Sequence, residues 1–259
     1  MHRRTFIGTL GGLGMLAPYG IGAAATESRR IFVLEQYYLK NGTQAGRIHE
    51  HFSKGAIPAL NKVHSGPKIF LESLVAPHMP QVAVIIGFQS LEELWNVHAK
   101  VLADPEFLKS VENWENHPEQ PYENASIVLL EATDYCPEVK QAPAPREKPR
   151  IFELRTYHSP TWRQLRALHE RFAGPEIKIF NRVGVNPILY SSTLIGPNMP
   201  NLTYVIPFEN LAAREKAWDA FGADPEWIKV RKESIDKHGQ ISSISQVSLY
   251  RATPYSPIR

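Results

Sequence analysis

The hydrophobic pattern of the chain alternates between the period of a strand and the period of a helix, in the same order twice. Segments 30–38 and 150–158 are rich in β-branched and aromatic residues, which is typical of strands. From Trp162 to Phe172 apolar residues recur at helical spacing, so a helix is predicted there, and Pro58 should kink or end its equivalent in the first half. Further strands are predicted at 68–75, 82–88, 126–132 and 246–252.

A constant offset of 120 residues, without insertion or deletion, relates the two halves of the chain. A single register held over about a hundred residues indicates a tandem of two copies of one unit. The copies are residues 30–133 and 150–253, and the proline-rich residues 134–149 are expected to form an extended linker. Identical pairs at this offset include His49 and His169, Asn61 and Asn181, Met79 and Met199, and Asp104 and Asp224.

Each copy reads as strand, helix, strand, strand, helical region, strand. This is the β-α-β-β-α-β order of a ferredoxin-like unit, whose antiparallel sheet carries helices on one face only. Ser90 and Asn210 should begin the second helical region as N-caps, and Asp104 and Asp224 should begin a further helix. The prediction is therefore an α+β protein: two tandem ferredoxin-like domains packed sheet to sheet, with a barrel-like space between them.

Side-chain alternation gives the first strand of each copy two distinct faces. Phe32, Leu34, Phe152 and Leu154 form an apolar face that is expected to pack on the helices. The other face should point into the space between the sheets, where charges must be paired or hydrated. Two interpretations stay open for its polar residues: an ion-pair network that locks the sheets together, or a cluster that orients a ligand. These residues are Glu35 and Tyr37 in the first copy and Glu153, Arg155 and Tyr157 in the second.

His49 and His169 occupy the same position in both copies, so each is a candidate general base or a ligand for haem or a metal ion. Half-buried packing on the helix face is the alternative account of both. His49 and His51 cannot chelate one ion together, because residues two apart on a helix diverge by about 200°. No other spacing of histidines and carboxylates fits a helical metal site, so no metal or cofactor is predicted.

Several segments of the second copy resemble the NIPSNAP family: the strand 152–157, the Asn198-Met199-Pro200 turn, and Arg214 followed by segment 224–227. The resemblance extends over both copies and implies a dimeric α/β-barrel fold. That superfamily also holds cofactor-free monooxygenases and haem-using enzymes, so the resemblance leaves the activity undefined.

Polar residues are distributed unequally between the copies, which predicts that any single site lies in the second. Arg155, Tyr157, His169, Tyr204 and Arg214 are its ligand-binding candidates. The first copy has Glu35, Val84 and Leu94 where the second has Arg155, Tyr204 and Arg214.

The functional classes that remain open are few, because no nucleophile motif or dinucleotide-binding loop follows a strand. Asp104 and Glu106 have a full structural account at a helix N-terminus. A non-catalytic ligand-binding or interaction module that uses the space between the sheets is favoured. A cofactor-independent oxygenase or isomerase is the alternative, and a haem-binding protein is a lesser one.

Residues 1–25 precede both copies and have the pattern of an export signal: a basic start, a short apolar run and a small-residue end at Ala25. Arg3 and Arg4 lie in a segment that resembles the twin-arginine motif, with an ordinary Sec signal as the alternative. Cleavage after Ala25 would leave the mature protein in the periplasm or outside the cell.

Charge and hydropathy limit the partners of the mature protein. Loss of Arg3 and Arg4 lowers the formal net charge from +3 to +1, which argues against nucleic acid as a partner. The apolar run of the leader is too short and too rich in glycine to form a stable membrane span. A small-molecule ligand and a homo-oligomer are the partners that stay open.

Overall fold

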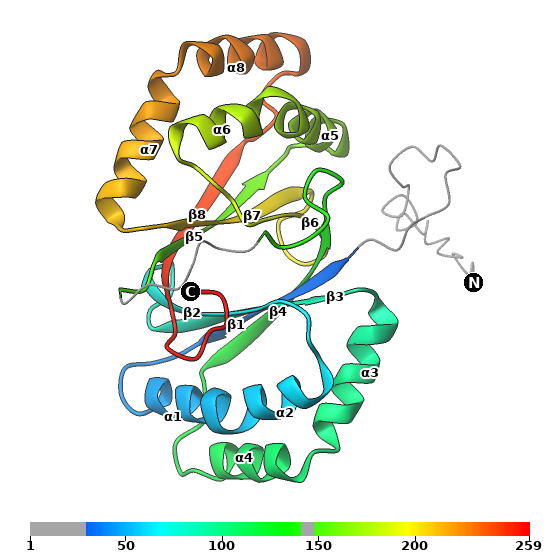
Figure 1. The fold of residues 1–259 in the computed structure, drawn as a ribbon, viewed down its shortest axis with the longest axis vertical. Coiled ribbons are helices and arrows are strands. Elements are labelled where there is room, and N and C mark those ends of the chain that lie inside the picture. Colours follow the sequence, from blue (N-terminus) through cyan, green and yellow to red (C-terminus); the bar gives the residue numbers. More distant parts are fainter. Residues whose placement is uncertain (1–29, 141–147) are drawn as a thin grey trace, which may run out of the picture.

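The structure, a computed structural model, describes residues 30–140 and 148–259. Its eight strands form one closed antiparallel barrel in the order β1-β3-β2-β8-β5-β7-β6-β4. The helices lie in two groups, one above and one below the strands in Figure 1. The α+β prediction is confirmed. The predicted leader, residues 1–25, and part of the predicted linker lie outside the described residues.

The predicted order of elements is present in both halves, and the predicted strand ends differ from the observed ones by at most two residues. The first half consists of β1 (Ile31–Tyr38), α1 (Gln44–His51), η2 (Phe52–Ala56), α2 (Ile57–Val63), β2 (Lys68–Val75), β3 (Gln81–Phe88), α3 (Leu91–Leu102), α4 (Pro105–Glu115) and β4 (Asn124–Ala132). The second half consists of β5 (Ile151–His158), α5 (Trp162–Arg171), η3 (Phe172–Glu176), α6 (Ile177–Val183), β6 (Leu189–Ile195), β7 (Asn201–Phe208), α7 (Leu211–Ala223), α8 (Pro225–His238) and β8 (Ile244–Ala252).

The predicted helix starts are confirmed by capping hydrogen bonds. Ser90 Oγ accepts the amide of Glu93 at 3.2 Å, and the Asp104 carboxylate accepts two amides of the first turn of α4. The first helix of each half contains one turn of π-helix, which the sequence did not predict. In the first half the amide of Ile57 donates to the carbonyl of Phe52, and Pro58 follows directly. Proline has no amide hydrogen, and the wider turn lets the helix continue past it where a kink or an end was predicted.

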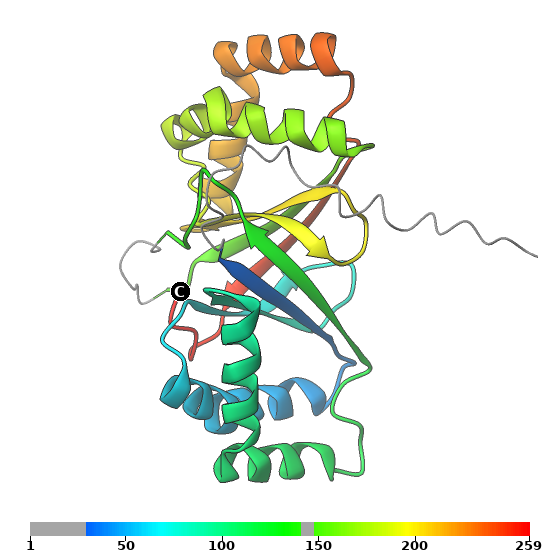
Figure 2. The same cartoon turned by 90° about the vertical axis from the view of Figure 1, so that its right-hand side faces the viewer.

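Strand pairing at two seams joins the halves. At one seam β2 pairs with β8, including Leu71 opposite Ala252, and at the other β4 pairs with β6, including Leu130 opposite Thr193. Figure 2 shows β1 and β4 running side by side across the middle of the molecule, with β6 beyond β4. The predicted space between two sheets is therefore the inside of one continuous barrel, whose described strands all have two neighbours.

The two faces of the first strand are the reverse of those predicted. Phe32, Leu34, Phe152 and Leu154 point into the barrel and pack in one apolar cluster drawn from both halves, whereas Val33 packs beneath α2 and α3. Alternation shows which side chains share a face but not which face meets the helices. A closed barrel gives a charged side chain no route to water, so the apolar set lies inside.

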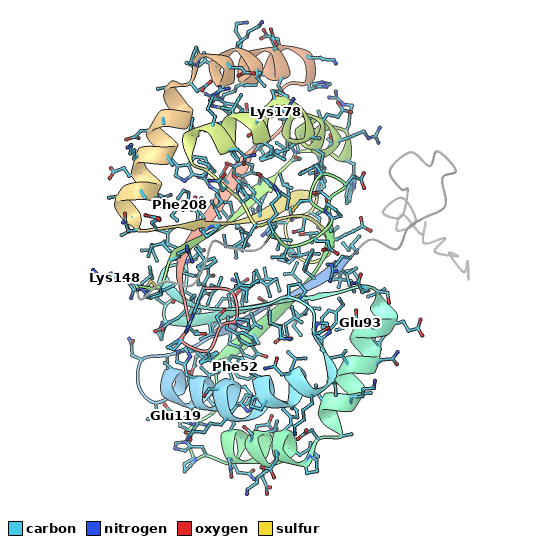
Figure 3. The ribbon with its side chains drawn as sticks, viewed as in Figure 1. Phe52, Glu93, Glu119, Lys148, Lys178 and Phe208 are labelled. Atoms are coloured by element: carbon cyan, nitrogen blue, oxygen red, sulfur yellow. The ribbon has the colours of Figure 1, made fainter. Side chains whose placement is uncertain are left out.

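The helix-facing side of each sheet holds a second core. Phe52 of η2 lies between the helices and the sheet of the first half, and Phe208 of β7 has the corresponding location in the second (Figure 3). The second-half core is rich in aromatic rings, with Phe172, Phe180 and Tyr190 all fully buried. This layer is where the polar face of β5 meets the helices.

Each half is also held by the segment that follows the last strand of the other half. Tyr135, which follows β4, places its hydroxyl 2.8 Å from His169 Nδ1 on α5. Tyr255, which follows β8, places its hydroxyl 2.7 Å from His49 Nδ1 on α1. We call these contacts the two clasps. The tyrosines are themselves 120 residues apart, so structural equivalence extends past residues 133 and 253, where the repeats were predicted to end. Buried Cys136, predicted to lie in a linker, belongs to this equivalent segment.

We expect each clasp to stabilise the half that contains the histidine. Tyr135→Phe should lower the free energy of unfolding by about 1 kcal/mol and reduce amide-exchange protection in α5 more than in α1. Tyr255→Phe should do the reverse, so each variant is the control for the other. Urea unfolding and hydrogen exchange measure the two effects. Equal loss of protection in both helices would contradict this role.

Candidate functional site

Two predicted site residues of the second half, Arg155 and Arg214, meet at the buried carboxylate of a third, Glu153. Glu153 of β5 is fully buried on the helix-facing side of the sheet. Its Oε1 lies 2.9 Å from Arg155 Nε, and its Oε2 accepts hydrogen bonds from Arg214 Nε and, at 3.2 Å, from Trp218 Nε1. Arg214 and Trp218 are four residues apart on α7 and so share one face of that helix. We call these four residues the Glu153 cluster.

The Glu153 cluster reaches the surface through its arginines. The side chain of Arg155 is 15% exposed and that of Arg214 is 25% exposed, whereas that of Glu153 is 0% exposed. The Arg155 guanidinium carbon lies 4.0 Å from the centre of the Trp218 ring, a cation–π contact that fixes its plane. Burial favours the neutral form of Arg155 and by itself lowers the pKa. The combined effect of Tyr204, Tyr157 and Glu153 is larger, so the pKa of Arg155 is raised and the guanidinium group stays charged.

Two tyrosines extend this polar region toward the core. Tyr204 of β7 is opposite Arg155 in the strand register and is fully buried, and its ring centre lies 5.2 Å from that of Tyr157. Burial raises the pKa of both phenols, so they remain neutral donors. Tyr190 stacks on Tyr204, and its buried hydroxyl has no hydrogen-bond partner within the described structure.

A second buried acid, which the sequence analysis missed, lies in the same layer. Glu176, the last residue of η3, is 1% exposed, and its Oε2 accepts a hydrogen bond from Arg171 Nε at 2.6 Å. Burial raises the pKa of Glu176 to about 7, although Arg171 opposes this shift. The first half has Ala56 at the equivalent position, so comparing charged residues across the 120-residue offset would have identified Glu176.

The first half has a different arrangement at the equivalent strand. Glu35 stands where Arg155 does and accepts a hydrogen bond from the Tyr37 hydroxyl at 2.7 Å. Burial raises the pKa of Glu35, with His98 of α3 acting in the opposite direction. No arginine meets Glu35 in the described structure, because Leu94 occupies the position of Arg214. The positive cluster thus belongs to the second half alone, as the unequal distribution of polar residues suggested.

None of the predicted strand residues points into the barrel. Glu153, Arg155 and Tyr157 contact α7 and η3, and Tyr37 packs on Phe52 of η2. Their expected location between the sheets was wrong because the two faces of the strand are reversed. The barrel interior holds its apolar cluster together with hydrogen-bonded polar side chains: Gln36 and Gln81 donate to the Tyr250 hydroxyl, and Thr156 bonds Thr203.

The two predicted histidines lie apart from the Glu153 cluster, in the clasps. Both ring nitrogens of His169 are within hydrogen-bond distance of hydroxyls, Nδ1 of Tyr135 and Nε2 of Ser192. His49 bonds Tyr255 and lies 3.9 Å from Glu72, and burial lowers its pKa. Residues 30–140 and 148–259 bring no three histidine, cysteine or acidic side chains into a metal-binding group.

Two cavities lie on the helices, away from the predicted residues. One of about 210 Å³ lies between α1 and α4 beside His51 and Trp114, and one of about 290 Å³ lies along α8 beside Trp227. Within the described ranges no helix combines the length and the apolar character needed to cross a bilayer.

Comparison with known proteins agrees with this architecture. Residues 152–257, most of the second half, match the NIPSNAP family model. The search of curated proteins gives no match.

Solved structures share the fold at low sequence identity. A proposed monooxygenase from Fusobacterium nucleatum is 8% identical, with a TM-score of 0.57 over 87% of this chain and 93% of its own. One from Lactobacillus acidophilus is 12% identical, with a TM-score of 0.51 over 86% and 94%. A proposed chlorite dismutase is 13% identical, with a TM-score of 0.50 over 89% and 97%. These likenesses show the dimeric α/β-barrel fold alone.

The buried acid Glu176 should make stability fall as pH rises. Its carboxyl ionises near 4.5 in the unfolded chain but near 7 in the folded protein, so the folded state holds the proton across this window. Relative to Glu176→Gln, the unaltered protein should lose about 3 kcal/mol of unfolding free energy between these pH values. Urea unfolding from pH 4.5 to 8 measures this, with Glu112→Gln on exposed α4 as the control. Parallel pH profiles for Glu176→Gln and the unaltered protein would contradict the shift.

Proposed function

We propose that this protein is a small-molecule-binding module of the NIPSNAP type, with its ligand site between the sheet and α7 of the second half. The Glu153 cluster carries this proposal. It places two arginines and an indole around one carboxylate in the half that matches the NIPSNAP model. The site lies on the helix-facing side of the sheet. The opposite side of the sheet faces the barrel interior, where the apolar cluster packs.

The energetics of the Glu153 cluster favour a functional role over a purely structural one. Burying a carboxylate costs several kcal/mol, and ion pairs offset that cost only in part. The first half keeps the same fold with Val33 at the position of Glu153 and Leu94 at that of Arg214, so the fold does not require these charges. Charges that the scaffold can do without, held at a partly exposed edge, are characteristic of binding sites.

Glu176 supports a second candidate function, a cofactor-independent oxygenase or isomerase. A buried carboxyl with a pKa near 7 can accept and return a proton at physiological pH, as a general base must. It shares its layer with the buried phenols of Tyr157, Tyr190 and Tyr204. Binding at the Glu153 cluster remains the main proposal, because the contacts around Glu153 support recognition of a ligand without any assumption about the chemistry of a reaction.

Export through the twin-arginine route completes the proposal. We expect the mature protein to begin near Thr26 and to act in the periplasm or outside the cell.

Arg155 should matter more for binding than for stability. In Arg155→Met, Glu153 keeps Arg214 and Trp218 on Oε2 but loses its partner on Oε1, so the unfolding free energy should fall by about 3 kcal/mol while binding of a ligand found by thermal-shift screening is lost. Arg182→Met is the control, since Arg182 pairs with Asp224 on the surface. Intact binding together with a large stability loss would make Arg155 a structural ion pair.

The export signal can be tested in the producing cell. Replacing Arg3 and Arg4 with lysines should leave an unprocessed precursor in the cytoplasm, because twin-arginine export needs the arginine pair. Cell fractionation and the mass of the mature protein report the outcome. Unchanged export of this variant would indicate the Sec route instead.

A further inference from the structure

The geometry around Glu153 also indicates which chemical group the site binds. Both arginines approach Glu153 through Nε, Arg155 on one carboxylate oxygen and Arg214 on the other. Each guanidinium group is thus anchored on its own oxygen of the same carboxylate. In the described structure neither directs a terminal amino group to Glu153 by a hydrogen bond.

The terminal amino groups of both arginines therefore form no hydrogen bond with Glu153 and are the groups that we expect a ligand to contact. The side chains of Arg155 and Arg214 are 15% and 25% exposed and that of Glu153 is 0% exposed, so water reaches the arginines but not the carboxylate. The ring of Trp218 packs against the Arg155 guanidinium group, with 4.0 Å between the guanidinium carbon and the ring centre. A guanidinium with a fixed plane presents paired N–H groups in the geometry that a carboxylate accepts.

The net charge of the Glu153 cluster indicates which kind of anion it would bind. Two arginines and one glutamate leave the cluster with one unpaired positive charge. A single carboxylate neutralises that charge, whereas a phosphate dianion would leave an excess negative charge beside buried Glu153. The first half offers no such match, because its equivalent positions carry Glu35 and Leu94.

We propose that Arg155 and Arg214 together bind the carboxylate of a small organic acid, with Glu153 as the fixed counter-charge that positions both guanidinium groups. This inference rests on the proposed ligand site and adds the class of ligand to it.

Benzoate and benzamide are suitable probes, because they have nearly the same shape and differ in charge. Calorimetry should show benzoate binding to the full mature protein and much weaker binding of benzamide. Arg214→Gln should weaken benzoate binding at least about tenfold, the cost of losing one charged hydrogen-bonding partner. Arg182→Gln, which removes a paired arginine elsewhere on the surface, should leave benzoate binding unchanged.

Arg214→Lys serves as the second variant if Arg214→Gln does not fold. It keeps the charge but removes the planar fork, so benzoate affinity should fall while the thermal midpoint stays close to that of the unaltered protein.

Several results would overturn the inference. The unaltered protein could fail to bind benzoate, could bind benzamide as tightly as benzoate, or could bind inorganic phosphate more tightly than benzoate. Equal losses of benzoate affinity in Arg214→Gln and Arg182→Gln would overturn it as well. A neutral compound that binds only when Arg155 is present would refute the carboxylate assignment and leave the proposed site intact. If no compound depends on Arg155, the proposed site itself is wrong.

Discussion

Closure of the sheet by hydrogen bonds at the β2–β8 and β4–β6 seams is the constraint on which the rest of the structure depends. Once both seams are paired, the inside of the barrel is sealed and must be filled with side chains that need no water. Phe32 and Phe152 meet that need. Every charge on the first strand of each half must then lie on the opposite face, beneath the helices. The location of the Glu153 cluster is thus a consequence of how the barrel closes.

Local signals in the sequence were sufficient to predict the elements of the fold. The 120-residue offset predicts the repeat, alternation predicts the strands, and Ser90 and Asp104 cap helices as expected. The direction of the polar face was not predictable in the same way. Alternation is symmetric between two faces, and only the long-range pairing at the seams decides which becomes the interior. Local signals could not distinguish a sheet covered on one side from a closed barrel.

The residues of the candidate site were predicted only in part. Arg155 and Arg214 were identified because they differ between the halves, and Glu153 because it shares a strand face with Arg155, and the three do meet in space. Trp218 and Glu176 were missed because each lies in a helix where its residue type also fits ordinary packing or solvation. Histidines that recur in both halves, such as His49 and His169, serve the clasps. In this protein a difference between the halves was a better guide to the Glu153 cluster than recurrence.

The two clasps have a consequence for how such a chain can change. Each half supplies a tyrosine to the other and receives one in return, as the two subunits of a symmetric homodimer do. In a homodimer every substitution is present in both subunits, so a charge introduced at the position of Arg155 would be buried twice. When both halves belong to one polypeptide, the substitution changes one half only, and the free-energy cost of burying the charge arises once. Covalent fusion therefore halves the energetic cost of a buried charge, and lets glutamate and arginine occupy symmetry-related positions of the same barrel.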